Sequence, residues 1–283
     1  MKNFRETCDF LVIGSGASGA VIAARLSENP DYKVVLLEAG GKNDSLLLNL
    51  PGLGFAVANN PRFNWGFESE PTPTMNNRKL TWLQGRVLGG SSSINSVIYT
   101  HGHSKEYDFW RQMGCEGWAS GDVLPYFKRC EKKIGVGEEI YRGREGNLQI
   151  NDLDWRDPLC DAFIEGANSI GIPSNADYNG AKQEGVSYVQ RTTHKRRRVS
   201  AARAFLNPAK SRSNLTIITN ALATKIILDG KRAVGVSYKK GLGDTQALEL
   251  RANKEVILSG GAINSPQLLQ LSGIGPVSYT HLR

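Results

Sequence analysis

The feature that most constrains this sequence is a glycine-rich turn that directly follows an apolar run near the start of the chain. The turn is GSGASG at residues 14–19, and the run before it is FLVI. A segment rich in small residues follows, and the run VVLL then ends at Glu38. Continuous apolar runs are typical of strands buried on both faces of a parallel sheet. The pattern therefore predicts a βαβ unit in an α/β fold.

The spacing of Gly14, Gly16 and Gly19 is typical of a dinucleotide-binding turn. The first glycine permits the tight turn, the second lets a pyrophosphate approach the backbone, and the third lets the helix pack on the strand. The helix N-terminus adds unpaired N–H groups and a positive dipole end. Glu38 lies where a carboxylate accepts hydrogen bonds from ribose hydroxyls, which disfavours a 2′-phosphorylated cofactor. FAD and NAD stay open at this point, as does a glycine-rich turn beside a surface glutamate.

Composition and charge are those of a globular protein with a positive field. The chain has 283 residues, 40% apolar and 22% charged, with a net charge of +8. This charge could attract nucleic acid, but the basic run KRRR at 195–198 lacks the aromatic residues that stack on bases. We expect a solvated basic turn there, before a helix over 200–206, and no nucleic-acid partner. The four cysteines lack the spacing of zinc sites or disulfide frameworks, so we predict no metal.

The N-terminus lacks the long apolar region of a secretion signal. No run approaches the ~20 apolar residues that a membrane-spanning helix needs. We expect a cytoplasmic protein without an integral membrane segment, and peripheral contact with the inner membrane stays open.

Further along, the pattern predicts helices over 106–133 with a break at 114–121, and another helix from Pro158 to Ser169. Strands are predicted at 215–219, 225–228, 233–239 and 247–250, which we interpret as a β-meander over 215–250. A buried strand at 255–259 precedes a helix that we expect to be capped by Ser265, with Pro266 at its first position.

Two long segments of the chain are GRVLGGSSSIN at 85–95 and GAINSPQLLQLSGIG at 261–275. The first is similar to the first signature, and the second to the second signature, of the glucose–methanol–choline (GMC) family of flavin oxidoreductases. Shorter segments, such as LPYF at 124–127, resemble the choline-dehydrogenase-like branch, and the resemblance covers residues 8–276. It implies a Rossmann-like FAD-binding domain with a parallel sheet and β-meander, formed by 1–140 and 196–276. Residues 141–195 would be part of an α+β substrate-binding domain.

The resemblance also implies non-covalent FAD, because Ile94 stands where some relatives have a histidine that tethers the flavin. Arg86 would add charge at the diphosphate. Trp65 resembles an aromatic residue near the flavin, with a plain core tryptophan as the alternative. Together with the glycine turn, the resemblance predicts a cofactor site formed by Gly14, Gly16, Ser18, Gly19, Glu38, Ala39, Trp65, Arg86, Val87, Gly89, Gly90, Ser91, Asn95, Ser96 and Ala223.

Three further positions follow from the same comparison. The family does not use His101 or His103 in catalysis, so we expect solvent-side or hydrogen-bonded histidines. Arg196 occupies a position where glycine is common in the family.

The implied activity is oxidation of the CH–OH group of an alcohol, choline-like or another primary alcohol, with hydride transfer to flavin N5. Electrons would pass to a quinone, a dye or oxygen. Dehydrogenase and oxidase stay open as alternatives, as does a catalytically inactive flavin-binding remnant. The family's catalytic histidine lies beyond the segment that matches here, and residues 277–283 do not resemble its continuation. We therefore expect an N-terminal fragment with an unrelated tail, assign no catalytic residue, and do not assign His281 as the base.

Overall fold

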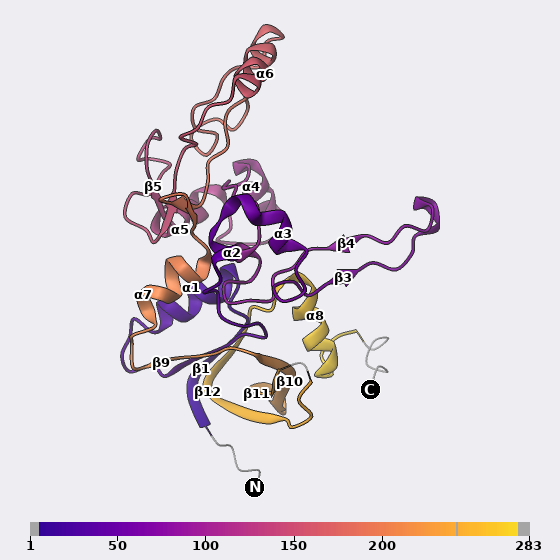
Figure 1. Ribbon diagram of the computed structural model, residues 1–283. Coiled ribbons are helices and arrows are strands. Elements are labelled where there is room, and N and C mark those ends of the chain that lie inside the picture. Colours follow the sequence, from indigo (N-terminus) through magenta and orange to yellow (C-terminus); the bar gives the residue numbers. More distant parts are fainter. Residues whose placement is uncertain (1–5, 242, 277–283) are drawn as a thin grey trace. The chain divides into compact units, whose positions relative to one another are not determined.

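The structure is a computed structural model that describes residues 6–241 and 243–276 (Figure 1). The chain divides into two compact units, one of Met1–Asn95 with Ser200–Arg283 and one of Ser96–Val199. Residues 96–140, assigned to the FAD-binding domain from the sequence, thus fall in the same unit as 141–195. The functional assignment of these segments stays a prediction.

A six-stranded sheet forms the centre of the first unit, in the order β10-β11-β12-β1-β2-β9. The pairs β12–β1, β1–β2 and β2–β9 are parallel, and β10–β11 and β11–β12 are antiparallel. This confirms the α/β class with a parallel sheet. The strands are β1 (Glu6–Ile13), β2 (Val34–Leu37), β9 (Leu215–Ile218), β10 (Ala221–Asp229), β11 (Arg232–Lys240) and β12 (Leu248–Leu258).

Helix α1 (Ala17–Leu26) connects β1 to β2, as the βαβ pattern predicted. Its buried residues are all glycine or alanine, so the helix can approach the sheet closely. Ile13 pairs with Leu37 on one side and with Leu258 on the other. Three parallel strands therefore end together, and ligands of α/β proteins bind outside such an edge.

The predicted meander over 215–250 is wrong in its first strand. β9 pairs with β2 in parallel, from Val34 with Leu215 to Leu37 with Ile218. The meander is β10–β12, and β12 is one continuous strand that joins the two segments predicted at 247–250 and 255–259. The first part of β12 pairs with β11 and the rest continues along β1, which fuses the meander to the parallel strands. Strand propensity marked these segments but does not specify a strand's partner.

The other elements of the first unit are short, apart from α8. Helix α8 begins at Gly261, so the predicted start with a Ser265 cap is wrong, and Ser265 and Pro266 lie inside the helix. Gly261, with φ 85°, allows the chain to turn directly after β12. These elements are α2 (Leu46–Asn49), η1 (Pro51–Leu53), α3 (Gly54–Ala58), β3 (Phe67–Glu68), η2 (Pro73–Met75), β4 (Thr81–Trp82), η3 (Gly90–Ser93), the π-helical η4 (Ala202–Leu206), α7 (Asn207–Ala209) and α8 (Gly261–Leu271).

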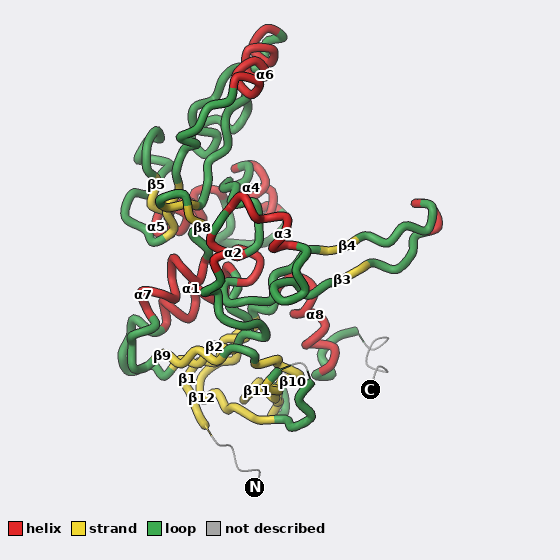
Figure 2. The backbone as a smooth tube through the Cα atoms, viewed as in Figure 1, coloured by secondary structure: helices red, strands yellow, loops and turns green. Residues whose placement is uncertain are grey.

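The second unit consists largely of loops between short elements (Figure 2). The helices predicted over 106–133 form with a break between them, but residues 131–133 are a strand that pairs in parallel with β6. Helix α6 has the predicted bounds. The elements are α4 (Ser104–Gln112), α5 (Ser120–Cys130), β5 (Glu131–Lys133), β6 (Leu148–Ile150), α6 (Pro158–Ser169), β7 (Thr193–His194) and β8 (Arg197–Arg198).

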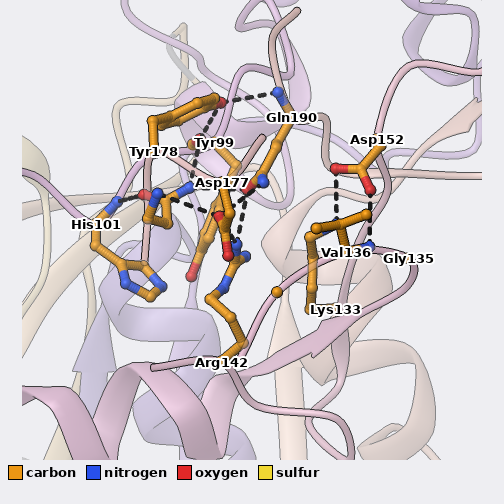
Figure 3. Close-up of polar contacts among 12 residues, drawn as sticks. Tyr99, His101, Lys133, Gly135, Val136, Arg142, Asp152, Asp177, Tyr178 and Gln190 are labelled. Carbon is orange, nitrogen blue, oxygen red and sulfur yellow. Dashed lines mark hydrogen bonds and ion pairs between the residues drawn. The ribbon is translucent and has the colours of Figure 1, made fainter. Parts of the chain in front are cut away.

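Buried charges form the polar core of the second unit (Figure 3). Arg142, 1% exposed, donates from Nε and Nη2 to the two carboxylate oxygens of Glu131, each at 3.0 Å. Its Nη1 donates to Asp177 Oδ1 at 2.6 Å and to Gln190 Oε1 at 2.9 Å. His101 Nε2 lies 3.2 Å from Glu131 Oε2. The network joins five positions that are far apart in the sequence.

The two histidines after the Gly85–Asn95 stretch behave as expected. His101 is buried and hydrogen-bonded to Glu131. His103 accepts the Lys105 N–H at Nδ1, at 3.1 Å, and caps α4. Both are confirmed as hydrogen-bonded side chains.

In the basic run at 195–198, Lys195 and Arg196 form the hairpin turn between β7 and β8, and Arg197 and Arg198 form β8. Lys195 and Arg196 have φ of 47° and 62°, the left-handed region that favours glycine, which gives a physical reason for glycine being common at the latter position. Arg197 is exposed, as expected. The expectation of a wholly solvated turn is wrong for Arg198, which is 3% exposed, and burial lowers its pKa to about 10. Successive strand residues point to opposite faces, so one of the pair turns inward.

We predict that Glu131→Gln lowers the free energy of unfolding at pH 7 by about 3–5 kcal/mol, because it leaves the buried Arg142 without its main counter-charge. Burial alone would raise the pKa of Glu131, but hydrogen bonds from His101 and Arg142 and the guanidinium charge lower it from 4.5 to about 2. A lowered folded-state pKa contributes stability above pH 4.5 that is lost as the pH falls towards 2. The difference between the two proteins should therefore narrow across that window in urea unfolding followed by circular dichroism. The exposed Glu116→Gln serves as control, and an equal effect of both changes would contradict the prediction.

We also predict that Arg196→Gly stabilises the chain by up to about 1 kcal/mol. Glycine removes the strain of a left-handed side chain, and the greater freedom of the unfolded chain offsets part of the gain. Arg197→Gly, one residue further in β8, should destabilise, because glycine weakens a strand. Urea unfolding compares the two variants, and a loss of stability in both would count against the turn geometry.

Candidate cofactor site

The predicted glycine turn lies at the carboxyl end of β1, and its glycines have distinct surroundings. Gly14 has φ 92°, and a Cβ there would contact the backbone carbonyl of Ser259. A Cβ on Gly19 would overlap the Gly14 carbonyl oxygen. A Cβ on Gly16 would meet nothing within 4 Å. The first and third glycines are therefore required by packing, whereas the second faces open space at the N-terminus of α1.

A buried carboxylate ties this turn to the rest of the sheet edge. Glu38, 5% exposed, accepts the backbone N–H of Ser15 at 3.0 Å and that of Gly40 at 2.8 Å. The Ser15 hydroxyl also donates to Glu38, and it accepts the N–H of Gly89 at 3.1 Å. Burial raises the pKa of Glu38, and these hydrogen bonds oppose the increase. Glu38 thus already has three donors within the chain, besides any ribose hydroxyl.

The GRVLGGSSSIN stretch lies directly against the glycine turn. A Cβ on Gly90 would approach the Gly16 Cα to 2.8 Å. Gly90 begins the short helix η3, and Ser91 Oγ accepts the N–H of Gly85 at 3.0 Å. Two glycine-rich segments far apart in the sequence therefore meet backbone to backbone.

These segments line a cavity of about 680 Å³, within the usual range for ligand sites. The first turn of α1 opens onto it, so its unpaired N–H groups and positive dipole end face the cavity. Donor N–H groups beside glycines that admit close approach fit the diphosphate of a dinucleotide. The chain thus supplies the groups that such a cofactor requires.

Many of the predicted site residues line this cavity and others do not. Gly19 packs beneath the turn, Gly89 is buried, and Asn95 is exposed. Arg86 and Val87 line a second cavity, and Ser96 belongs to the second unit. The predicted residues that line the first cavity are Gly14, Gly16, Ser18, Glu38, Ala39, Trp65, Gly90, Ser91 and Ala223.

Two predicted positions have surroundings that bear on the flavin. Trp65 is half-buried, stacks on Phe67 with ring centroids 5.7 Å apart, and lines the cavity, so it is not a plain core tryptophan. Ile94 is 5% exposed and belongs to a small apolar cluster with Phe63 and Val87. Its side chain offers no nucleophile for a covalent tether.

The sequence analysis missed several residues of the site. Ser15 joins the turn to Glu38 and Gly89, but serine at a variable position of the glycine pattern carries no signal of that role. Ser259 and Gly260 follow β12 and line the cavity beside Gly14. The available signal was the end of a predicted strand followed by two glycines, the second of which is the first residue of the second family signature.

The fold and the site define an α/β protein with a glycine-lined cofactor pocket at the carboxyl edge of its parallel strands. The model of the GMC oxidoreductase family matches residues 8–280, and the chain belongs to this family. The match runs into residues 277–283, which we expected to be unrelated and which lie outside the described residues.

Similar proteins agree with this assignment. The chain is 46% identical over 272 residues to the oxygen-dependent choline dehydrogenase of Sinorhizobium medicae, covering 96% of this chain and 48% of that protein. Among solved structures, pyridoxine 4-oxidase from Mesorbium loti has a TM-score of 0.89 at 32% identity, with 96% of this chain and 53% of that one covered. An FAD-dependent oxidoreductase from Chaetomium thermophilum has a TM-score of 0.89 at 31% identity, with 96% and 48% covered. The chain spans about half the length of the curated relatives it matches.

No helix in the described part of the chain has both the length and the apolar character needed to cross a membrane.

We predict that Gly19→Ala lowers the free energy of unfolding by about 1–3 kcal/mol or more, because the new methyl group overlaps a rigid backbone carbonyl. Gly16→Ala is the matched control and should change stability by less than about 0.5 kcal/mol, since its methyl group meets no atom. Thermal and urea unfolding of the flavin-free chain measure both. Equal losses would mean that the turn does not pack as described.

Proposed function

We propose that this chain binds FAD non-covalently and forms the flavin-binding part of an oxidoreductase that oxidises the CH–OH group of an alcohol. The observation that supports this most directly is the meeting of the two glycine-rich segments, at Gly16 and Gly90, over a cavity at the end of three parallel strands. Family membership supports the same cofactor. Bound FAD supplies a hydride acceptor at the flavin N5.

The chain's own residues would hold and orient the cofactor. The N–H groups of the first turn of α1 would bind the diphosphate, and the open space at Gly16 would admit it. Glu38 has four acceptor positions and uses three within the chain, so one stays free for a ribose hydroxyl. The backbone at Ala223 on β10 would lie beside the adenine, and Trp65 beside the flavin ring.

The substrate that we propose is a choline-like or other primary alcohol, and the electron acceptor a quinone, a dye or oxygen. The curated relatives named oxygen-dependent choline dehydrogenases support this choice. No histidine among the described residues lines the cavity. We therefore expect the 283 residues to bind flavin without turning over alcohol.

Two alternatives to a dehydrogenase stay open within this proposal: an oxidase that passes electrons to oxygen, and a flavin-binding remnant that transfers no electrons. An alcohol oxidase of the same family is favoured by neighbours named oxidases, and it would release peroxide. A catalytically inactive flavin-binding remnant would show bound flavin and no electron transfer, even with the remaining part of a relative added. A cytoplasmic location stays a prediction that cell fractionation tests.

We predict that the purified chain carries FAD and that acid precipitation releases it into the supernatant. Gly16→Ala should reduce FAD affinity about tenfold or more, because a methyl group enters the closest approach of backbone and diphosphate. The absorbance of bound flavin and its titration into the flavin-free protein measure both effects. Flavin that stays with the acid precipitate would overturn non-covalent binding. Unchanged affinity in a folded Gly16→Ala protein would overturn the site.

Alcohol-dependent dye reduction and peroxide release form the second assay. Each is measured with choline and with a primary aliphatic alcohol as substrate. Activity of the chain alone would contradict our expectation that the 283 residues bind flavin without turning over alcohol.

A further inference from the structure

A second cavity of the first unit, of about 510 Å³, carries three cationic side chains, Lys42, Arg62 and Arg86. Asp44 is the one acidic side chain among the lining residues, so the three cations and one anion give the walls a net charge of +2. Thr219 and Asn220 follow β9, and the Lys42 loop follows β2. This cavity therefore also lies at the carboxyl edge of parallel strands, a usual place for ligands.

Arg86 was expected to add charge at the flavin diphosphate, yet it lines this second cavity and not the first. Its Nη2 donates to the Pro61 carbonyl at 2.8 Å, and its guanidinium lies 5.7 Å from the centroid of the Trp65 ring. Among the described residues, no carboxylate forms an ion pair with Lys42, Arg62 or Arg86. Most of the donor capacity of a half-buried guanidinium is thus unused within the chain.

The backbone around these cations is held firmly. A Cβ on Gly40 would overlap the Arg86 carbonyl oxygen, so the two segments touch backbone to backbone. Leu88 N–H donates to the Gly41 carbonyl at 2.9 Å, and Asn220 N–H to the Gly40 carbonyl at 2.8 Å. The cavity is therefore preorganised, and a ligand that enters it has little backbone to order.

We propose that this cavity binds a divalent oxyanion, such as a phosphate or a small dicarboxylate. A guanidinium presents a planar fork that suits two oxygens of one anion, and the cations at the exposed rim, Lys42 and Arg62, add charge. The net charge of the walls matches a double negative charge. The same field disfavours a quaternary ammonium alcohol. This second cavity shares only Ala39 with the lining of the first cavity, the one that we propose binds FAD (the flavin cavity). Anion binding in the second cavity therefore does not depend on the proposed function.

The test is isothermal titration of the 283-residue chain with inorganic phosphate and, separately, with succinate. The double variant Lys42→Gln/Arg62→Gln removes two cations whose side chains are exposed, so the fold should be unaffected. The control Lys225→Gln/Arg78→Gln removes the same charge from exposed positions outside the cavity. We expect the first variant to weaken binding about tenfold or more and the control to leave it within about twofold.

Saturable binding of phosphate alone would define the ligand as a phosphate compound. Saturable binding of succinate alone would define it as a dicarboxylate. Each of these two outcomes supports the proposal. The charge-preserving variant Lys42→Arg/Arg62→Lys should retain binding. Lack of saturable binding for both anions would overturn the site. Equal weakening by the control variant would overturn it too, since the effect would then come from net charge. Flavin content, read separately by absorbance, shows whether the proposed function holds.

Discussion

The buried carboxylate of Glu38 is the interaction on which the site depends. It stands at the end of β2, accepts from Ser15 in the turn after β1, and accepts from Gly40 in the loop that leads to the second cavity. Through the Ser15 hydroxyl it also orients Gly89, in the other glycine-rich segment. A buried charge must keep its hydrogen-bond partners, because loss of one leaves a costly unsatisfied group. The two walls of the flavin cavity are therefore held together by the chain itself.

Local signals predicted much of this arrangement. A strand, a glycine turn, a helix and a second strand follow one another within 38 residues, and each is visible from its own composition. What could not be predicted is non-local. The pairing of β9 with β2 and the continuity of β12 depend on which strands meet, which composition does not encode. Likewise, the carboxylate of Glu38, which the pattern assigns to a ribose, accepts three hydrogen bonds inside the chain, and nothing in the pattern marks Ser15 as the donor of two of them.

Arg86 shows how neighbours in a motif can serve different cavities. Gly85 lines the flavin cavity, and Arg86 lines the cationic one. The bridges from Gly85 to Asn64 and from Val87 to Gly41 hold this stretch in strand-like pairing between the two. A motif match therefore locates a segment near a cofactor but does not say which way each side chain faces.

Helix α6 shows that local sequence signals can set the bounds of a helix without providing the packing that stabilises it. Its predicted bounds are right because the signals are local: Asp157 accepts the Leu159 N–H at 2.9 Å, and Pro158 occupies the first turn. Yet none of its residues is buried, and Leu159 and Phe163 are 79% and 71% exposed. A helix of this length is marginal in water without tertiary packing of its apolar face. Capping thus sets where the helix begins and ends, whereas its contacts with the rest of the chain are mostly polar, such as the hydrogen bond that the Tyr188 hydroxyl donates to Asp161 Oδ1 at 2.8 Å.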